Sequence, residues 1–274
     1  MSFQRQIRPE RSHTYHIAHV DFIRGVLAWR LWFGLGLHDI RIRYKRTLLG
    51  PWWITASQTA TFVCLGMLFS AVLKNDVRTY LPHLAAGMVT WTFISAVAGD
   101  GAHIFVGSRQ IITSMPIPMI VHVLRCSVRN LLIFLHNFSS AVAAYLLLGG
   151  KFTEASLLLL LGIPLLFVTL SAGGLLLAIV GARFRDVGPV IGIVTQLMFF
   201  MTPIMWRPED IPDGSKWWVS INPAYHLIEM VRAPMLGGMP TALSIEVSLA
   251  LAAGMPLAAY LMFCALRHRI SYWL

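Results

Sequence analysis

Between Thr47 and Leu73 the sequence runs for twenty-seven residues without a single Asp, Glu, Lys or Arg. In lipid, such a stretch satisfies its backbone hydrogen bonds only as a helix, and about 20 apolar residues suffice to cross the hydrocarbon core. Nine Lys and Arg residues precede it. Because basic residues accumulate on the cytoplasmic side of membrane helices, this junction predicts a membrane span that follows a cytoplasmic segment.

The composition extends this prediction to the whole chain, which is 57% hydrophobic and only 12% charged. Soluble domains carry about 25% charged residues. The net charge of +10 gathers at predicted helix ends on one side, which indicates orientation against membrane lipid and not binding to nucleic acid. The three cysteines have neither metal-site nor disulfide spacing. The N-terminal segment lacks the apolar region of a signal peptide, so we expect no cleavable leader.

We expect an all-α membrane protein that crosses the bilayer six times. Charge-free runs near the required length place the spans at about 52–73, 79–99, 119–150, 155–181, 187–205 and 247–266, the third with its uncharged part at 130–150. With both termini in the cytoplasm, sixteen Lys and Arg residues lie inside and six outside, as the positive-inside rule requires. The chain thus divides into a cytoplasmic segment, 1–50, and a transmembrane domain, 51–270.

Two segments do not read as spans. Residues 20–38 place apolar side chains near helical spacing among few charges, which predicts an amphipathic helix in the cytoplasmic interface. The outer segment 207–240 holds five prolines between short apolar pieces. These pieces are too short to cross the membrane, so we expect short re-entrant helices on the outer face.

Several kinds of chemistry are missing from the sequence. No predicted span carries a carboxylate at its centre, which argues against an ion gradient as the energy source. The nearest string to a phosphate-binding loop, 149–151, has Tyr145 where the first glycine belongs and Phe152 where Ser or Thr belongs. We therefore expect no enzyme activity, no metal and no cofactor on this chain, and ATP only on a separate chain.

One polar constellation stands on the third predicted span. Its members are spaced 3, 4, 7 and 4 residues apart, so they share one helical face: His122, Arg125, Arg129, His136 and Ser140. This face is interpreted as the wall of a substrate path whose inner mouth attracts phosphate, which arginine binds well. The alternative is that the arginines snorkel to the inner interface and His136 bonds between helices.

Aromatic and cytoplasmic segments leave similar alternatives open. Trp91 lies near mid-span, where it either stacks on sugar rings in the substrate path or packs between helices. Tryptophans near predicted interfaces are typical of aromatic belts. Gly188 and Gly192 form a GxxxG, a weak signal for close helix approach. The cytoplasmic stretch 107–118 is either a helix that docks a soluble partner or a plain turn.

Four short motifs follow one another in the order of a known family. The run 43–53 (RYKRTLLGPWW) precedes the first span, and RFRDV stands at 183–187. Thr202-Pro203-Ile204 closes the fifth span, and Ile221-Asn222-Pro223 lies outside, followed by Arg232. Over roughly 20–270 the chain resembles ABC-2-type permeases, which export bacterial polysaccharides such as O-antigen, capsule and teichoic acid.

The resemblance implies a homodimer of six-span subunits in the bacterial inner membrane, bound to two ATPase subunits that hold ATP and Mg²⁺. Spans one and five would line the channel, and the substrate would be a glycan on a lipid pyrophosphate, as in lipopolysaccharide biosynthesis. The implied ATPase-coupling residues are Arg43, Lys45, Arg46, Arg109, Met115, Pro116 and Pro118. The implied outer gate comprises Trp206, Trp217, Trp218, Asn222, Pro223 and Arg232.

Three alternatives remain beside the polysaccharide exporter. Within the same class, the chain would be an ABC-2 permease for a drug or a simple lipid. From another class comes a membrane enzyme of glycan assembly, although metal-dependent transferases need carboxylates to hold Mg²⁺ and spans two to four offer few. A passive channel is the third.

Overall fold

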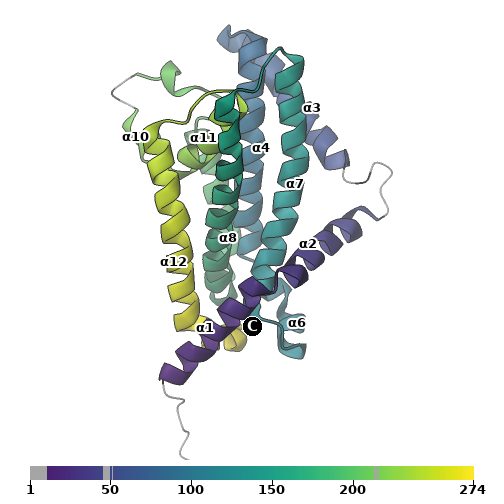
Figure 1. Cartoon of the computed structure of the whole chain (residues 1–274), viewed down its shortest axis with the longest axis vertical. Helices are drawn as coiled ribbons and strands as arrows, with labels where there is room; N and C mark the ends of the chain where they lie inside the picture. Colours follow the sequence, from purple (N-terminus) through teal and green to yellow (C-terminus); the bar gives the residue numbers. More distant parts are fainter. Residues whose placement is uncertain (1–10, 46–49, 51, 213, 215) are drawn as a thin grey trace, which may run out of the picture.

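The computed structural model describes residues 11–45, 50, 52–212, 214 and 216–274, and these residues form helices and no β-strand. Arg46, which the resemblance assigned to ATPase coupling, lies outside them, as does most of the linker before the first span. The helices form an elongated bundle, and two N-terminal helices cross one end of it (Figure 1).

Five helices among these residues are long and apolar enough to cross a membrane. They are α3 (Trp52–Leu73), α4 (Val77–Gly101), α7 (Met119–Leu147), α8 (Leu159–Arg183) with the 3₁₀ turn η1 (Glu154–Leu158) before it, and α12 (Ala242–Trp273). The predicted first span has the observed bounds, whereas the predicted last span, 247–266, is shorter than α12.

The fifth predicted span, 187–205, is shorter in the structure. Its helix, α9 (Val187–Met201), has 15 residues, or about 22 Å of rise, against a hydrocarbon core of about 30 Å. The helix ends because Thr202 adopts an extended conformation directly before Pro203, which disfavours helical geometry at the residue that it follows. The structure thus contains five long apolar helices and one short one in the predicted order.

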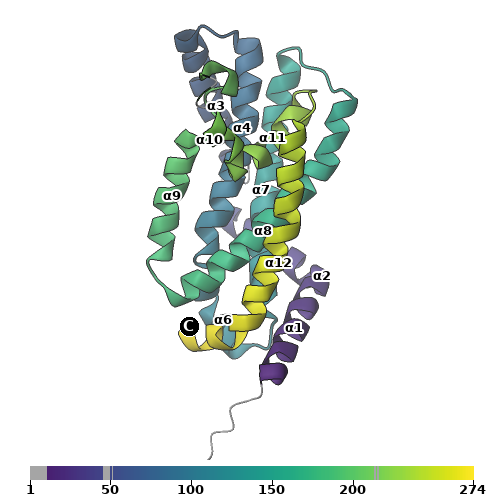
Figure 2. The ribbon, with the colours of Figure 1, turned by 90° about the vertical axis from the view of Figure 1, so that its left-hand side faces the viewer.

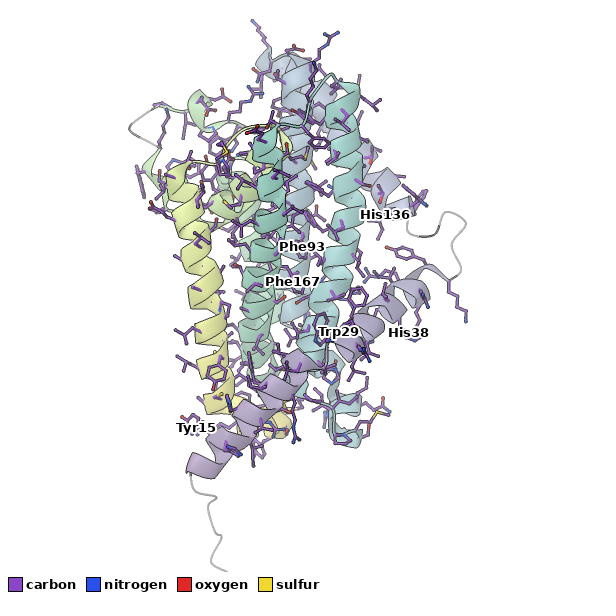
Figure 3. The ribbon with its side chains drawn as sticks, viewed as in Figure 1. Tyr15, Trp29, His38, Phe93, His136 and Phe167 are labelled. Atoms are coloured by element: carbon purple, nitrogen blue, oxygen red, sulfur yellow. The ribbon has the colours of Figure 1, made fainter. Side chains whose placement is uncertain are left out.

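The core lies around α4, which packs against α3, α7, α8 and α11 (Pro223–Met235). Phe93 of α4 stacks on Phe134 of α7 with ring centroids 5.0 Å apart, and Figure 3 shows Phe93 and Phe167 among the central helices. Helix α8 approaches the end of α4 closely, because a Cβ added at Gly181 would lie 2.0 Å from the carbonyl oxygen of Ala102. Glycine therefore sets the distance between these helices.

The N-terminal helices α1 (Arg11–Leu27) and α2 (Trp29–Tyr44) lie across one end of the bundle (Figure 1). They contact α12 and α7, while Leu27, Trp29 and Phe33 are exposed, as expected for helices in a membrane interface. The predicted helix, 20–38, was too short and missed the break at Ala28. Helix α12 ends beside α1, so both lie at the same end of the molecule (Figure 1).

The remaining segments are short. α5 (Ile104–Gly107) and α6 (Arg109–Ser114) follow α4 at the end where α1 lies (Figure 1). Near the opposite end, η2 (Pro208–Asp210) and α10 (Trp217–Ser220) precede α11. Figure 2 shows α9 standing apart from the α8 and α12 side of the bundle, and none of its residues is buried.

Candidate functional site

The polar face of α7 meets carboxylates from two other helices. Arg125 Nε and Nη2 donate to the two oxygens of Asp39 on α2, at 2.7 and 2.5 Å. Arg129 Nη2 donates to Asp100 Oδ2, at the end of α4, at 2.7 Å, and Arg129 Nη1 lies 3.8 Å from Asp39. Asn130 Nδ2 also donates to Asp100, at 2.9 Å. Both arginines are thus engaged in ion pairs that join three helices.

These groups surround a cavity of about 300 Å³ at the end of the bundle where α6 lies. His122, which is 2% exposed, lines it together with Gly107, Ser108 and Ile111 from the stretch 107–118. Both ring nitrogens of His122, and Arg129 Nε, are buried without a hydrogen-bond partner among the described residues. The formal charges of the two arginines and two aspartates cancel, which weakens the attraction of this cavity for a phosphate group.

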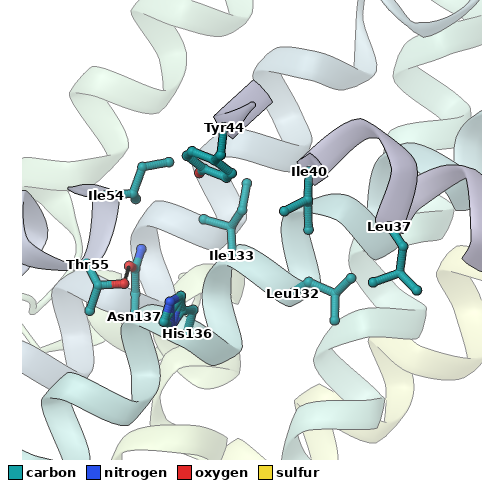
Figure 4. Close-up of a pocket in the computed structure, with 9 residues that line it drawn as sticks. All are labelled: Leu37, Ile40, Tyr44, Ile54, Thr55, Leu132, Ile133, His136 and Asn137. Atoms are coloured by element: carbon teal, nitrogen blue, oxygen red, sulfur yellow. Dashed lines mark hydrogen bonds between the residues drawn. The ribbon is translucent and has the colours of Figure 1, made fainter. Parts of the chain in front are cut away.

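His136 and Ser140 lie farther along α7, apart from this cavity. His136 packs edge-on against Trp52 at 4.4 Å between ring centroids and lines a largely apolar cavity of about 200 Å³ between α2, α3 and α7 (Figure 4). In the same cavity Thr55 Oγ1 donates to Asn137 Oδ1 at 3.1 Å. Ser140 donates to the carbonyl of Asn137 in its own helix at 2.8 Å.

Trp91 lies on another side of α4. It is 8% exposed, and its ring is 6.0 Å from that of Phe199 on α9. It lines a cavity of about 290 Å³ with Thr195 and Gln196 of α9. The structure therefore gathers His122, Arg125 and Arg129, and distributes the other predicted path residues over separate places. Their role in a substrate path stays a prediction.

The predicted coupling residues fall in two places, the segment at and after α6 and the end of α2 (Figure 1). Arg109 begins α6, a helix with no buried residue, and Met115 is 56% exposed. Pro116 is exposed, and Pro118 caps the start of α7. Arg43 and Lys45 are exposed at the end of α2 and at the residue that caps it. Arg109, Met115 and Pro116 are thus exposed at the end where α6 lies, whereas Arg43 lies farther along the bundle, beside a cavity that Ile54 and Asn137 also line.

The predicted outer-gate residues lie near the opposite end. The rings of Trp206 and Trp218 are 5.3 Å apart, whereas Trp217 is exposed. Asn222 caps α11, which begins at Pro223, because its side-chain oxygen accepts hydrogen bonds from the backbone N–H groups of residues 224 and 225. Its side-chain Nδ2 donates to Thr202 Oγ1 at 3.0 Å. The end of α9 is thereby attached to the start of α11.

Arg232 of α11 is 3% exposed and bonds to three other residues. Its Nη2 donates to Glu229 at 2.6 Å, and its Nη1 donates to the carbonyl of Pro203 at 2.6 Å and to Nε2 of His83 at 3.2 Å. A neighbouring cavity of about 370 Å³ includes Glu209 and Tyr225 in its lining. Burial and the nearby Glu229 raise the pKa of the Tyr225 phenol above its ordinary value.

The sequence reasoning missed the carboxylates that hold these arginines. The sequence patterns assigned no partner to Asp39, Asp100 or Glu229. One signal was present: the chain has only 12 acidic residues, so each acid beside an apolar run is a candidate partner for a basic side chain at membrane depth.

Comparison with known proteins identifies the family. The family model described as ABC-2 type transporter matches residues 32–236. This chain belongs to the ABC-2 transporter family. The match runs from within α2 to just after α11, so it includes the ion pairs of α7, the exposed helix α6 and the buried Arg232.

The chain is also similar to individual proteins that are named for O-antigen export or polysialic acid transport. The chain is 26% identical over 204 residues to the O-antigen export system permease protein RfbA of Klebsiella pneumoniae, covering 73% of this chain and 78% of that protein. It is 24% identical over 221 residues to the RfbA protein of Myxococcus xanthus, covering 78% and 84%. It is 23% identical over 207 residues to the polysialic acid transport protein KpsM of Escherichia coli, covering 74% and 80%.

Proposed function

We propose that this chain is the membrane subunit of an ATP-driven exporter that moves a lipid-linked polysaccharide, of the O-antigen or capsule type, across the inner membrane. The observation that carries the proposal is that relatives covering about three quarters of the chain are named for O-antigen export or polysialic acid transport. The ABC-2 family is one of permease subunits, so ATP and Mg²⁺ are expected on a separate ATPase chain.

The exposed apolar faces of α3 and α9 support a homodimer. α9 exposes Ile193, Leu197 and Phe200, and it also exposes the amide of Gln196. An amide at membrane depth is costly against hydrocarbon unless it meets protein or water. A second copy placed against α3 and α9 would cover the apolar residues and leave the polar ones beside a passage between the subunits.

The charge distribution supports cytoplasmic termini and an ATPase at the end that carries α1 and α6. Two ATPase subunits, one for each copy, would engage Arg109 and Met115 of the exposed segment. Closure of the ATPases on ATP would displace this segment and the helices that touch it. The passage would then open for a glycan attached to a lipid pyrophosphate.

The first experiment deletes the gene in its host and follows the lipid-linked glycan inside the cell and on its surface. We expect completed glycan trapped on the cytoplasmic side. Glycan that is never completed would indicate an enzyme of assembly, and normal surface glycan would show that polysaccharide is not the substrate.

A second experiment tests the ATPase partner. The tagged chain is purified from its host, and we expect an ATPase to accompany it. Arg109→Ala combined with Met115→Ala should weaken this association, whereas Lys151→Ala, an exposed cation predicted on the outer side, should not. Equal loss for both variants would contradict the assignment of the docking surface.

A further inference from the structure

The interface helix α2 is seated on α7 by a close backbone approach followed by an ion pair. A Cβ added at Gly36 would lie 3.0 Å from Val128 Cγ1 and 3.1 Å from the carbonyl oxygen of Arg125. Asp39, three residues later, shares that helical face, and both of its carboxylate oxygens accept hydrogen bonds from Arg125. A bidentate, charge-assisted pair fixes direction as well as distance, so it holds α2 in one register on α7.

The contact continues from α7 to α4. Arg129, one turn beyond Arg125, lies between Asp39 and Asp100, at 3.8 and 2.7 Å. These four side chains, Asp39, Asp100, Arg125 and Arg129, are named here the joint. The side chains of Asp39, Arg129 and Arg125 are 12%, 19% and 26% exposed, so solvent screens these three less than a surface ion pair, whereas Asp100 is 40% exposed.

The joint also borders the coupling segment. Ser108 and Ile111, which lie in the stretch 107–118 proposed to dock the ATPase, help to line its cavity. His122 and Arg129, which carry the unpartnered buried nitrogens, line the same cavity. The joint therefore connects α2, α4 and α7 directly beside the segment proposed to meet the ATPase.

We infer that Asp39 is a positioning residue for transport: it orients Arg125 and Arg129 so that movement of the coupling segment and α2 is transmitted to α4 and α7. This inference rests on the proposed function. It assigns the two arginines to transmission within the protein and not to binding the phosphate of a substrate, because carboxylates of the same chain already neutralise them.

The test measures polysaccharide exported per ATP hydrolysed by the full complex with its ATPase. We expect Asp39→Asn and Arg125→Gln each to lower this ratio by about 5-fold or more, the lower end of typical coupling between sites, while the ATPase remains bound and active. Asp39→Glu keeps the charge and should restore most of the ratio. The matched control is Arg267→Gln, which breaks the pair between Arg267 and Asp21 that joins α12 to α1 at 3.3 Å, and it should leave the ratio near that of the wild type.

The other outcomes contradict the inference that Asp39 positions Arg125 and Arg129 for transport. If Arg125→Gln abolishes export while Asp39→Asn does not, the arginine acts on the substrate phosphate. If Arg267→Gln lowers the ratio equally, the effect is general destabilisation. Should Asp39→Asn fail to accumulate, the exchange of Asp39→Arg with Arg125→Asp re-forms the pair, and a folded exchange variant that stays uncoupled overturns the inference. Failure of the proposed function is distinct, because the unsubstituted complex would then export no polysaccharide, and the inference would fall with it.

Discussion

Replacing the buried arginine of α11 tests how the outer segment is held. Arg232 donates to Glu229 through Nε and Nη2, at 3.0 and 2.6 Å, and to the carbonyl oxygen of Pro203 at 2.6 Å. Arg232→Ala leaves the Glu229 carboxylate, whose side chain is 17% exposed, without its counter-charge. It also removes the hydrogen-bond donor to the carbonyl oxygen of Pro203, in the segment that follows α9.

The magnitude follows from these contacts. Removing one partner of a buried ion pair costs about 3–5 kcal/mol, and an abandoned neutral acceptor costs about 1–3 kcal/mol. Because Glu229 keeps some access to water, we expect Arg232→Ala to lower the free energy of unfolding by about 3 kcal/mol or more. Arg232→Met combined with Glu229→Gln removes both charges, so it should cost less than Arg232→Ala alone.

The assay unfolds the protein in mixed micelles with a rising proportion of a denaturing detergent. Unfolding is monitored by the fluorescence of the nine tryptophans. The control is Arg78→Ala, since Arg78 is an exposed arginine near the start of α4, and surface substitutions usually change stability by less than about 0.5 kcal/mol. If Arg232→Ala unfolds together with Arg78→Ala and the wild type, the buried network does not hold the outer segment and the reasoning is wrong.

Two further substitutions test close packing and capping. Gly181→Ala should prevent accumulation of folded protein, because its Cβ would lie 2.0 Å from the Ala102 carbonyl, whereas Gly254→Ala, which meets nothing within 4 Å, should be neutral; equal yields measured by size-exclusion chromatography would refute this. Asn222→Ala removes the cap of α11 and the bond to Thr202, so it should cost about 1–2 kcal/mol in the micelle assay, and unchanged stability would contradict the capping role.

Sequence patterns predicted most of the fold because lipid imposes local rules. Every backbone group in the hydrocarbon must be bonded within its own helix, so long charge-free runs correspond to α3, α4, α7, α8 and α12. The bounds of α1 and α2 were less predictable, since a helix in an interface has no fixed thickness to match and its ends depend on the helices on which it rests. α9 ended early for a reason visible in the sequence, the proline at 203.

The candidate site was predictable in part. Spacing correctly placed His122, Arg125 and Arg129 on one side of α7, and the structure gathers them at one cavity. The same spacing placed His136 on the same face of α7. That part of the face meets α3, so His136 lies against Trp52 and not in the cavity with the other three residues. Helical spacing says which side chains share a face, but not which helices that face meets.

Hydrophobicity and the positions of basic residues determine on their own that this is a helical membrane protein, and they predict which end of it is cytoplasmic. Both are local properties, because the cost of exposing a backbone group or a charge to lipid is incurred residue by residue. Only the tertiary structure decides that Arg125 meets Asp39, 86 residues away, and that Arg232 meets Pro203. Such pairings depend on the rotation and approach of whole helices, which side-chain packing sets across the bundle.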